Sequence, residues 1–212
     1  MSIAEKTLLL KQDFDEVYEA GYEKGKSEGG GVDNRYDAFW DAFQNYGNRY
    51  HWNNAFFQLG WNDVSYGQIK YPITEIRYGR QMFMQSSITD TLMPLDFSNV
   101  SAQPVSVFDY CTRLATIRTL TVGESNTFSN WFRECNNLEN ITFEGVIGKN
   151  ELNFQWSTKL SHDSLVSIIN CLQDKSADTS GTVWKVIVGS TNYAKLTDED
   201  LINISEKGWV FE

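Results

Sequence analysis

Two seven-residue stretches decide the fold: Phe108-Asp109-Tyr110-Cys111-Thr112-Arg113-Leu114 and Phe132-Arg133-Glu134-Cys135-Asn136-Asn137-Leu138. They lie 24 positions apart, and a weaker copy begins at Phe83, 25 positions before the first. All three follow the pattern F-x-x-C/S-x-x-L/T-x-x-I/L and lead into predicted short strands such as Ile117–Val122 or Ile141–Phe143. One such unit cannot close a hydrophobic core, whereas stacked neighbours can. The period therefore predicts stacked units, each with one short strand and one turn or short helix.

Stacking places equivalent residues of successive units in columns. The sequence predicts that Cys111 and Cys135 are reduced, buried and stacked on one another, with Ser86 at the same place in the first unit. A zinc pair is disfavoured, because no histidine lies nearby and zinc sites usually show closely spaced ligand pairs. We expect no metal and no cofactor.

Residues 1–28 are predicted to form a helix with a short coiled-coil-like seam. Gly29-Gly30-Gly31 would form a hinge after it. Such a helix is marginal alone, so we expect it to mediate attachment or self-association, and the chain to be a homo-oligomer. The alternative is a helix folded back on its own domain, or a frayed tail. The proposed attachment residues are Ile3, Leu10, Phe14 and Val17.

Residues 29–80 are rich in aromatic side chains. A second helix is predicted from Asp33, with Tyr36, Phe39, Trp40 and Phe43 at helical spacing. The aromatic residues that follow it are expected to plug the open end of the stacked units, and a sugar-binding platform is the alternative. They are Trp52, Phe56, Phe57 and Trp61.

The C-terminal part predicts a cap for the stack. Ser161 and Thr197 are each placed to cap a helix, and residues 182–188 and 209–211 are β-rich. We therefore assign residues 81–212 to a repeat domain with its own C-terminal α/β cap.

The F-x-x-C-x-x-L-x-x-I units over residues 83–147 resemble the BspA-type leucine-rich repeats of bacterial surface proteins. Segments in the flanks resemble proteins of this type from gut Firmicutes, their phages and prophages. They are Tyr36-Asp37-Ala38-Phe39-Trp40-Asp41, Ala55-Phe56, Gly60-Trp61 and Lys207-Gly208-Trp209. The resemblance implies a short leucine-rich-repeat β/α solenoid, class α/β, with an N-terminal helical segment and a C-terminal cap. It also implies a surface or virion role.

Composition excludes several classes of function. The formal net charge is −10, and no run of lysine and arginine occurs, which disfavours binding to nucleic acid. No stretch has the roughly 18 apolar residues of a membrane span, and no secretory signal peptide is visible. The two histidines, His51 and His162, are interpreted as packed or surface residues. No catalytic motif is found, so we expect a protein that is not an enzyme.

The function predicted on these grounds is that of a phage or prophage virion-associated structural or host-surface-binding protein, in the tail, baseplate or head-fibre class. Its partners would be other virion proteins or further copies of itself, together with a host-surface glycan or protein. Its location would be the virion, because phage proteins are made in the host cytoplasm and released by lysis. The alternative is a bacterial surface or intracellular interaction and adhesion module. The proposed ligand-binding residues are Arg118, Thr119, Thr121, Thr142, Glu144 and Lys185. The alternative is that this face is only solvated and binds nothing.

Overall fold

The computed structural model describes residues 68–69, 73, 76–91, 94–150 and 152–212, all within one compact unit, Tyr50–Glu212. The predicted helix 1–28, its attachment residues Ile3, Leu10, Phe14 and Val17, and the aromatic residues from Tyr36 to Trp61 lie outside the described residues. Predictions for them, and the domain boundaries at 28 and 80, stay predictions.

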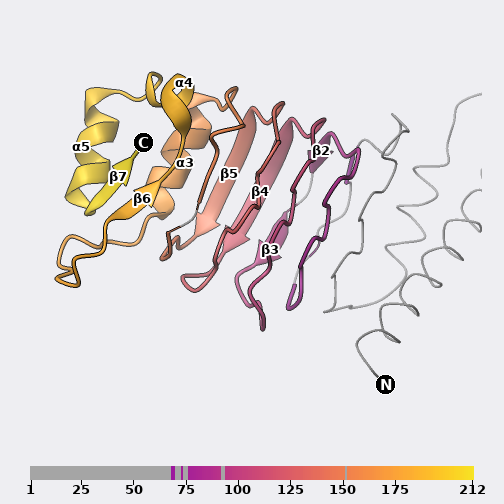
Figure 1. Ribbon diagram of the computed structural model, residues 1–212, viewed down its shortest axis with the longest axis horizontal. Coiled ribbons are helices and arrows are strands. Elements are labelled where there is room, and N and C mark those ends of the chain that lie inside the picture. The colour runs from indigo at the N-terminus through magenta and orange to yellow at the C-terminus, as the bar shows by residue number, and fades with distance from the viewer. Residues whose placement is uncertain (1–67, 70–72, 74–75, 92–93, 151) are drawn as a thin grey trace, which may run out of the picture. The chain divides into compact units, whose positions relative to one another are not determined.

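A parallel five-stranded sheet forms one side of the described structure (Figure 1). β2 and β3 pair with successive parts of β4 along one edge, and β5 pairs with β4 along the other. The side chains alternate, so that Ile117, Leu120 and Val122 of β4 are buried while Arg118 is exposed. The strands are β1 (Gln68–Ile69), β2 (Asp90–Thr91), β3 (Leu95–Phe97), β4 (Thr116–Val122) and β5 (Asn140–Gly145).

A second set of backbone hydrogen bonds joins the turn segments that carry the repeated phenylalanines. The Phe83 N–H donates to the Val107 carbonyl over 2.8 Å, and the Phe108 N–H donates to the Trp131 carbonyl over 3.0 Å. In each unit, the residue two positions before the phenylalanine and the residue two positions after it have positive φ. This conformation directs alternate backbone N–H groups toward the next unit. The positive-φ residues are Gln81, Gln85, Ser106, Tyr110, Asn130 and Glu134.

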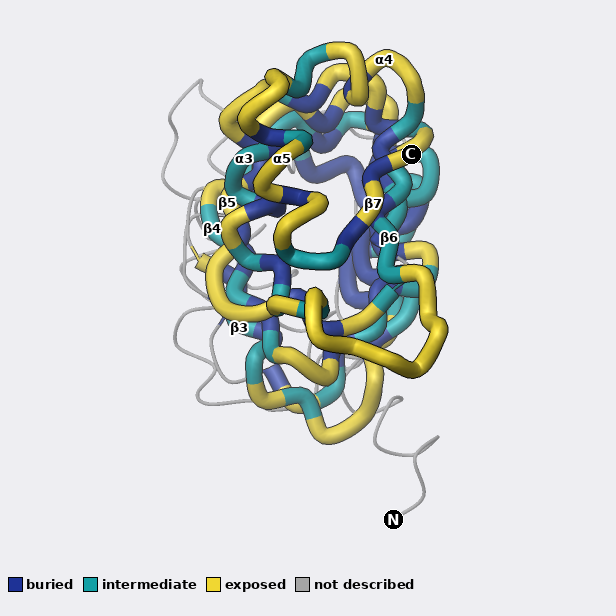
Figure 2. The backbone as a smooth tube through the Cα atoms, turned by 90° about the vertical axis from the view of Figure 1, so that its left-hand side faces the viewer, coloured by how far each residue is buried: buried dark blue, intermediate teal, exposed yellow. Residues whose placement is uncertain are grey.

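The core between these two ladders is a column of phenylalanine rings. Phe83, Phe108 and Phe132 stack with centroids 5.3 and 5.8 Å apart, and Phe154 continues the stack 4.6 Å beyond Phe132. All four are buried. Figure 2 shows the buried segments of the backbone in dark blue. Phe154 begins a further copy of the pattern, ending at Leu160, that the sequence analysis missed.

The cysteine column predicted from the sequence is confirmed. Cys111 and Cys135 are free, fully buried thiols, and Cys111 Sγ lies 3.6 Å from Ser86 Oγ. Each thiol also donates to a phenylalanine carbonyl of the preceding unit, over 2.9 Å to Phe83 and 3.1 Å to Phe108. The hydrogen bond, as well as the limited space, therefore explains why this position holds a small side chain.

The C-terminal region contains helices and a separate sheet. Both predicted caps are confirmed: the Ser161 side chain accepts from the Ser164 N–H, and Thr197 forms a capping box with Asp200. β6 and β7 pair in parallel as a two-stranded sheet. The elements are α3 (His162–Cys171), β6 (Trp184–Val186), α4 (Gly189–Tyr193), α5 (Asp198–Glu206) and β7 (Trp209–Phe211).

The expected leucine-rich-repeat β/α solenoid is wrong. The described residues form a small mixed α/β structure with few helices and two small sheets. Among the described residues between β1 and β5 none is helical and many lie in turns, and the helices of the described part all follow Ser161. The sheet of β6 and β7 does not extend the sheet of β1 to β5. The repeat period predicted the columns correctly, but the segments before β4 and β5 form turns whose positive-φ residues, such as Tyr110 and Glu134, cannot belong to the right-handed helices that the solenoid required.

Candidate recognition face

The outer face of the five-stranded sheet carries polar side chains in rows that cross the strands. The strand register pairs Asp96 with Thr121 and Thr121 with Glu144, so these three residues form one row. Glu144 is exposed, and Asp96 and Thr121 are half-buried. The buried residues that alternate with them, Leu120 and Phe143, fix which way each strand faces.

A break in the register between Ile117 and Leu120 shapes the middle of this face. There the Arg118 backbone N–H donates to the Thr91 hydroxyl over 3.2 Å. Arg118 and Thr142 are exposed and Thr119 is half-buried. Five of the six predicted binding residues, Arg118, Thr119, Thr121, Thr142 and Glu144, therefore lie on two neighbouring strands.

Lys185 does not join this group. It lies in β6, where its ammonium forms a 2.7 Å ion pair with the carboxylate of Glu212. The strand continues into Ile187, which exchanges hydrogen bonds with the turn segment at Leu152 and Phe154. Lys185 thus belongs to the ladder of the turns and not to the row on β4 and β5.

Two parts of the face were not predicted from the sequence. Asp96 completes the row of Thr121 and Glu144, and a second row runs from Asp90 through Thr116 to Asn140. The alternation of Leu95, Asp96 and Phe97 could have indicated the first row. The second row could not be found without the register of β2.

Helix α3 closes the outer edge of the sheet. The hydroxyl of Ser164 accepts from the Ile141 N–H over 2.9 Å and lies 3.2 Å from the Glu139 carbonyl. The hydroxyl of Ser167 accepts from the Phe143 N–H over 3.2 Å and lies 3.1 Å from the Ile141 carbonyl. The two serines thereby satisfy the backbone groups that a further strand would bind, which removes an open edge that favours aggregation.

The groups that could serve as nucleophile or base are held in structural contacts. Burial raises the pKa of the Cys111 thiol to about 12, and burial likewise raises the pKa of Cys135. His162 Nε2 lies 2.8 Å from the carboxylate of Asp200 and joins α3 to α5. His51 lies outside the described residues, and among the described residues no cluster of three potential metal ligands occurs.

Carboxylates, hydroxyls, an amide and one guanidinium thus occupy the face, on a backbone fixed by hydrogen bonds on both sides of β4. Such a surface can exchange hydrogen bonds with a polar partner.

Comparison of the chain with protein-family models, with curated proteins and with solved structures gives no match. Within the described residues, no helix combines the length and apolarity that crossing a membrane requires.

Proposed function

We propose that this chain is a non-enzymatic binding protein that recognises a polar partner through the outer face of its five-stranded sheet. The observation that carries the proposal is the strand register that aligns Asp96, Thr121 and Glu144 beside exposed Arg118 and Thr142. Parallel strands present these groups on a rigid surface, which lowers the entropy lost on binding.

A binding function is favoured over catalysis by the state of the reactive side chains. A thiol whose pKa is near 12 is protonated at neutral pH and is a poor nucleophile, which applies to Cys111. His162 is engaged by Asp200 between two helices. The polar groups of the sheet face are spread over several strands instead of converging on one point.

For the biological setting we propose a phage or prophage virion, with the host surface as the source of the polar partner. The support is the resemblance of residues 83–147 and their flanks to proteins from phages and gut Firmicutes. In this setting residues 1–28 would attach the chain to other virion proteins or to further copies. Mass spectrometry of purified particles would detect the chain if this setting is right, and its absence from particles would favour a bacterial surface or intracellular adhesion module.

The recognition face is tested by replacing Arg118 and Glu144 together with alanine. Both side chains are exposed, so the free energy of unfolding should change by less than about 1 kcal/mol. Binding to host cells or envelope fractions should be lost.

The variant Lys185→Ala, Glu212→Ala is a matched control, because it also removes one cation and one carboxylate, but at the two-stranded sheet. This control variant should keep full binding. If the Arg118→Ala, Glu144→Ala variant also keeps full binding, recognition does not use this face.

A further inference from the structure

Trp156 differs from the other tryptophans that the structure describes. In Trp131, Trp184 and Trp209 the indole N–H donates to an oxygen of the chain, and the ring lies beside another aromatic ring. Within the described part of the chain Trp156 has neither contact, and it is only half-buried. Its indole nitrogen is not shielded from solvent, so it can donate to a molecule outside the chain.

The fold places Trp156 at the corner of the turn in the unit that begins at Phe154. The Ser157 N–H donates to the Phe154 carbonyl over 2.8 Å, and this bond closes the turn. The equivalent bond closes the turns of the units that begin at Phe108 and Phe132. Because the rings of Phe132 and Phe154 stack 4.6 Å apart, the turn of Trp156 lies beside the turn of the preceding unit.

Polar groups occupy the same corner in the two preceding units. Glu134 has the place of Trp156 one unit before it, and Tyr110 has this place two units before it. Both residues are half-buried, and the side-chain amide of Asn136 donates to the Glu134 carboxylate over 3.2 Å. Neighbouring strands lie about 5 Å apart, so the corner positions of the stacked units form one row.

The charges beside Glu134 limit the kind of ligand that this row can bind. The guanidinium of Arg133 lies over the Tyr110 ring, 5.1 Å from its centroid, where it occupies the ring as a cationic ligand would. The same guanidinium binds both carboxylate oxygens of Asp109, which neutralises it. Glu134 adds a further carboxylate to a chain of net charge −10, which disfavours an anionic ligand. An uncharged ligand with several hydroxyl groups fits these conditions.

We propose that Trp156, Glu134 and Asn136 bind an uncharged glycan. A sugar ring has an apolar face of C–H groups and a rim of hydroxyl groups, so its face can lie on the indole ring of Trp156. The indole N–H, the Glu134 carboxylate and the Asn136 amide then exchange hydrogen bonds with the hydroxyl groups. The row follows the stacking direction of the units, which suits a chain of sugars. The site lies on the turns, apart from the sheet face of the proposed function, and either can fail without the other.

The probes are cellohexaose and maltohexaose, two uncharged hexasaccharides of different shape, each titrated into the isotope-labelled full chain while nuclear magnetic resonance spectra are recorded. The indole N–H resonance of Trp156, assigned by its loss in Trp156→Phe, should shift with at least one sugar, and that of buried Trp131 should not. By calorimetry, Trp156→Leu should weaken binding roughly tenfold, as expected for the loss of an aromatic contact. Glu134→Gln should weaken it roughly threefold, because the amide replaces only part of the hydrogen bonding.

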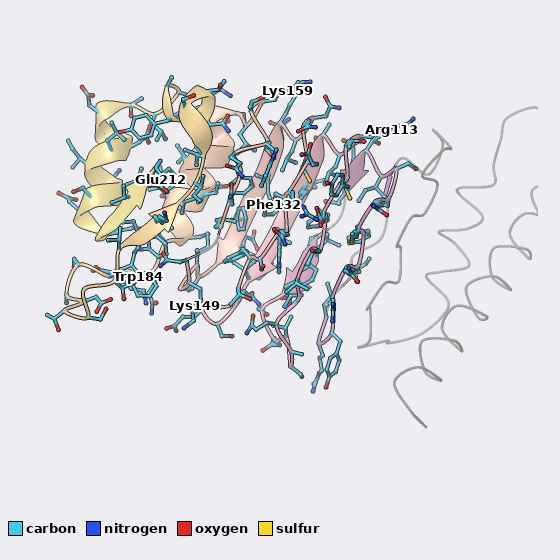
Figure 3. All side chains as sticks on the ribbon, viewed as in Figure 1. Arg113, Phe132, Lys149, Lys159, Trp184 and Glu212 are labelled. Carbon is cyan, nitrogen blue, oxygen red and sulfur yellow. The ribbon has the colours of Figure 1, made fainter. Side chains whose placement is uncertain are left out.

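Trp184→Leu is the matched control, because it removes another half-buried tryptophan and should bind as the wild type does. Figure 3 shows Trp184 well apart from Phe132, whose unit carries Glu134 and Asn136. Thermal unfolding of each variant checks that the fold is kept. Equal losses of affinity for Trp156→Leu and Trp184→Leu would overturn the site, and so would an unshifted Trp156 resonance with both sugars. Tighter binding of tetramethylammonium ion than of either sugar at Trp156 would overturn the glycan assignment.

Discussion

The two halves of the described chain place different structures after the same repeated leucine. Leu114 is followed by Ala115 and then by β4, whereas Leu160 is followed by Ser161 and then by helix α3. After Leu114 the sequence alternates apolar and polar residues with β-branched side chains, which favours a strand. After Leu160 it offers an N-cap serine, an acidic first turn and apolar residues at helical spacing. Local sequence therefore decides between strand and helix at an equivalent place in the stack.

The comparison also shows what each half contributes. The strand half presents polar rows on a sheet face, and the helical half closes that sheet through Ser164 and Ser167. The stack of phenylalanine rings runs through both halves, because Phe154 packs on Phe132. The turn segment of Phe154 is also hydrogen-bonded to the backbone of Ile187. The effect of a substitution on the free energy of unfolding should therefore depend on how deeply the affected groups are buried, and not on the type of contact that is lost.

Ion pairs in the two halves give the largest expected difference. Asp109 is fully buried, and Arg133 binds both of its carboxylate oxygens over 2.8 and 2.6 Å. Arg133→Ala leaves that carboxylate buried without a partner and should destabilise the protein by about 3–5 kcal/mol. Lys185→Ala breaks a solvent-exposed pair with Glu212 and should cost less than about 1 kcal/mol. Denaturant unfolding of the two variants measures both values.

The double change Asp109→Leu, Arg133→Met is the control for this prediction, because it removes both charges and keeps the bulk. It should recover most of the stability lost in Arg133→Ala. Equal losses for Arg133→Ala and Lys185→Ala would show that the Asp109 carboxylate is not buried as described.

A smaller effect is expected at the capping box of α5. Burial acts to raise the pKa of Asp200, but hydrogen bonds from His162 and Thr197 outweigh it, and the pKa lies below its usual value. A lowered carboxyl pKa stabilises the fold above the unfolded pKa of about 3.9, and this contribution is lost as the pH falls through the folded pKa. Asp200→Asn should therefore cost about 1 kcal/mol at pH 7.

The measurement is the difference in thermal stability between the wild type and Asp200→Asn as a function of pH. The difference should persist from pH 7 to about pH 5 and shrink below about pH 4. A difference that is constant down to low pH would mean that the charge of Asp200 has no part in holding α5.

Several features could be predicted from the sequence because they depend on neighbours in the chain. The caps at Ser161 and Thr197 and the buried alternation of Ile117, Leu120 and Val122 are of this kind. The cysteine column followed from the period alone. The wrong solenoid came from extending a family resemblance to segments that fold as turns with positive-φ residues.

Other features could not be predicted because they depend on partners distant in the sequence. The strand at Lys185 was expected, but which ladder it joins is decided by Leu152 and Phe154. The copy at Phe154 follows Phe132 by only 22 positions and has Ser157 in place of cysteine, which concealed it. In the sequence Ser164 and Ser167 cannot be told from other polar residues of a helix. Their role depends on the position of the edge of β5, whose backbone their hydroxyls bind.

Helix α3 takes the place of a further strand beside β5, and hydrogen exchange tests this arrangement most directly. In the wild type the amides of Ile141 and Phe143 should exchange slowly. The amide of Ile117, on a strand paired on both sides, should also exchange slowly. In the Ser164→Ala, Ser167→Ala variant the Ile141 and Phe143 amides should exchange roughly tenfold to a hundredfold faster, since each loses its acceptor. The Ile117 amide should not change, and Ser205→Ala on the exposed side of α5 should leave all three unchanged. Unchanged protection of Ile141 and Phe143 in the double variant would contradict this arrangement.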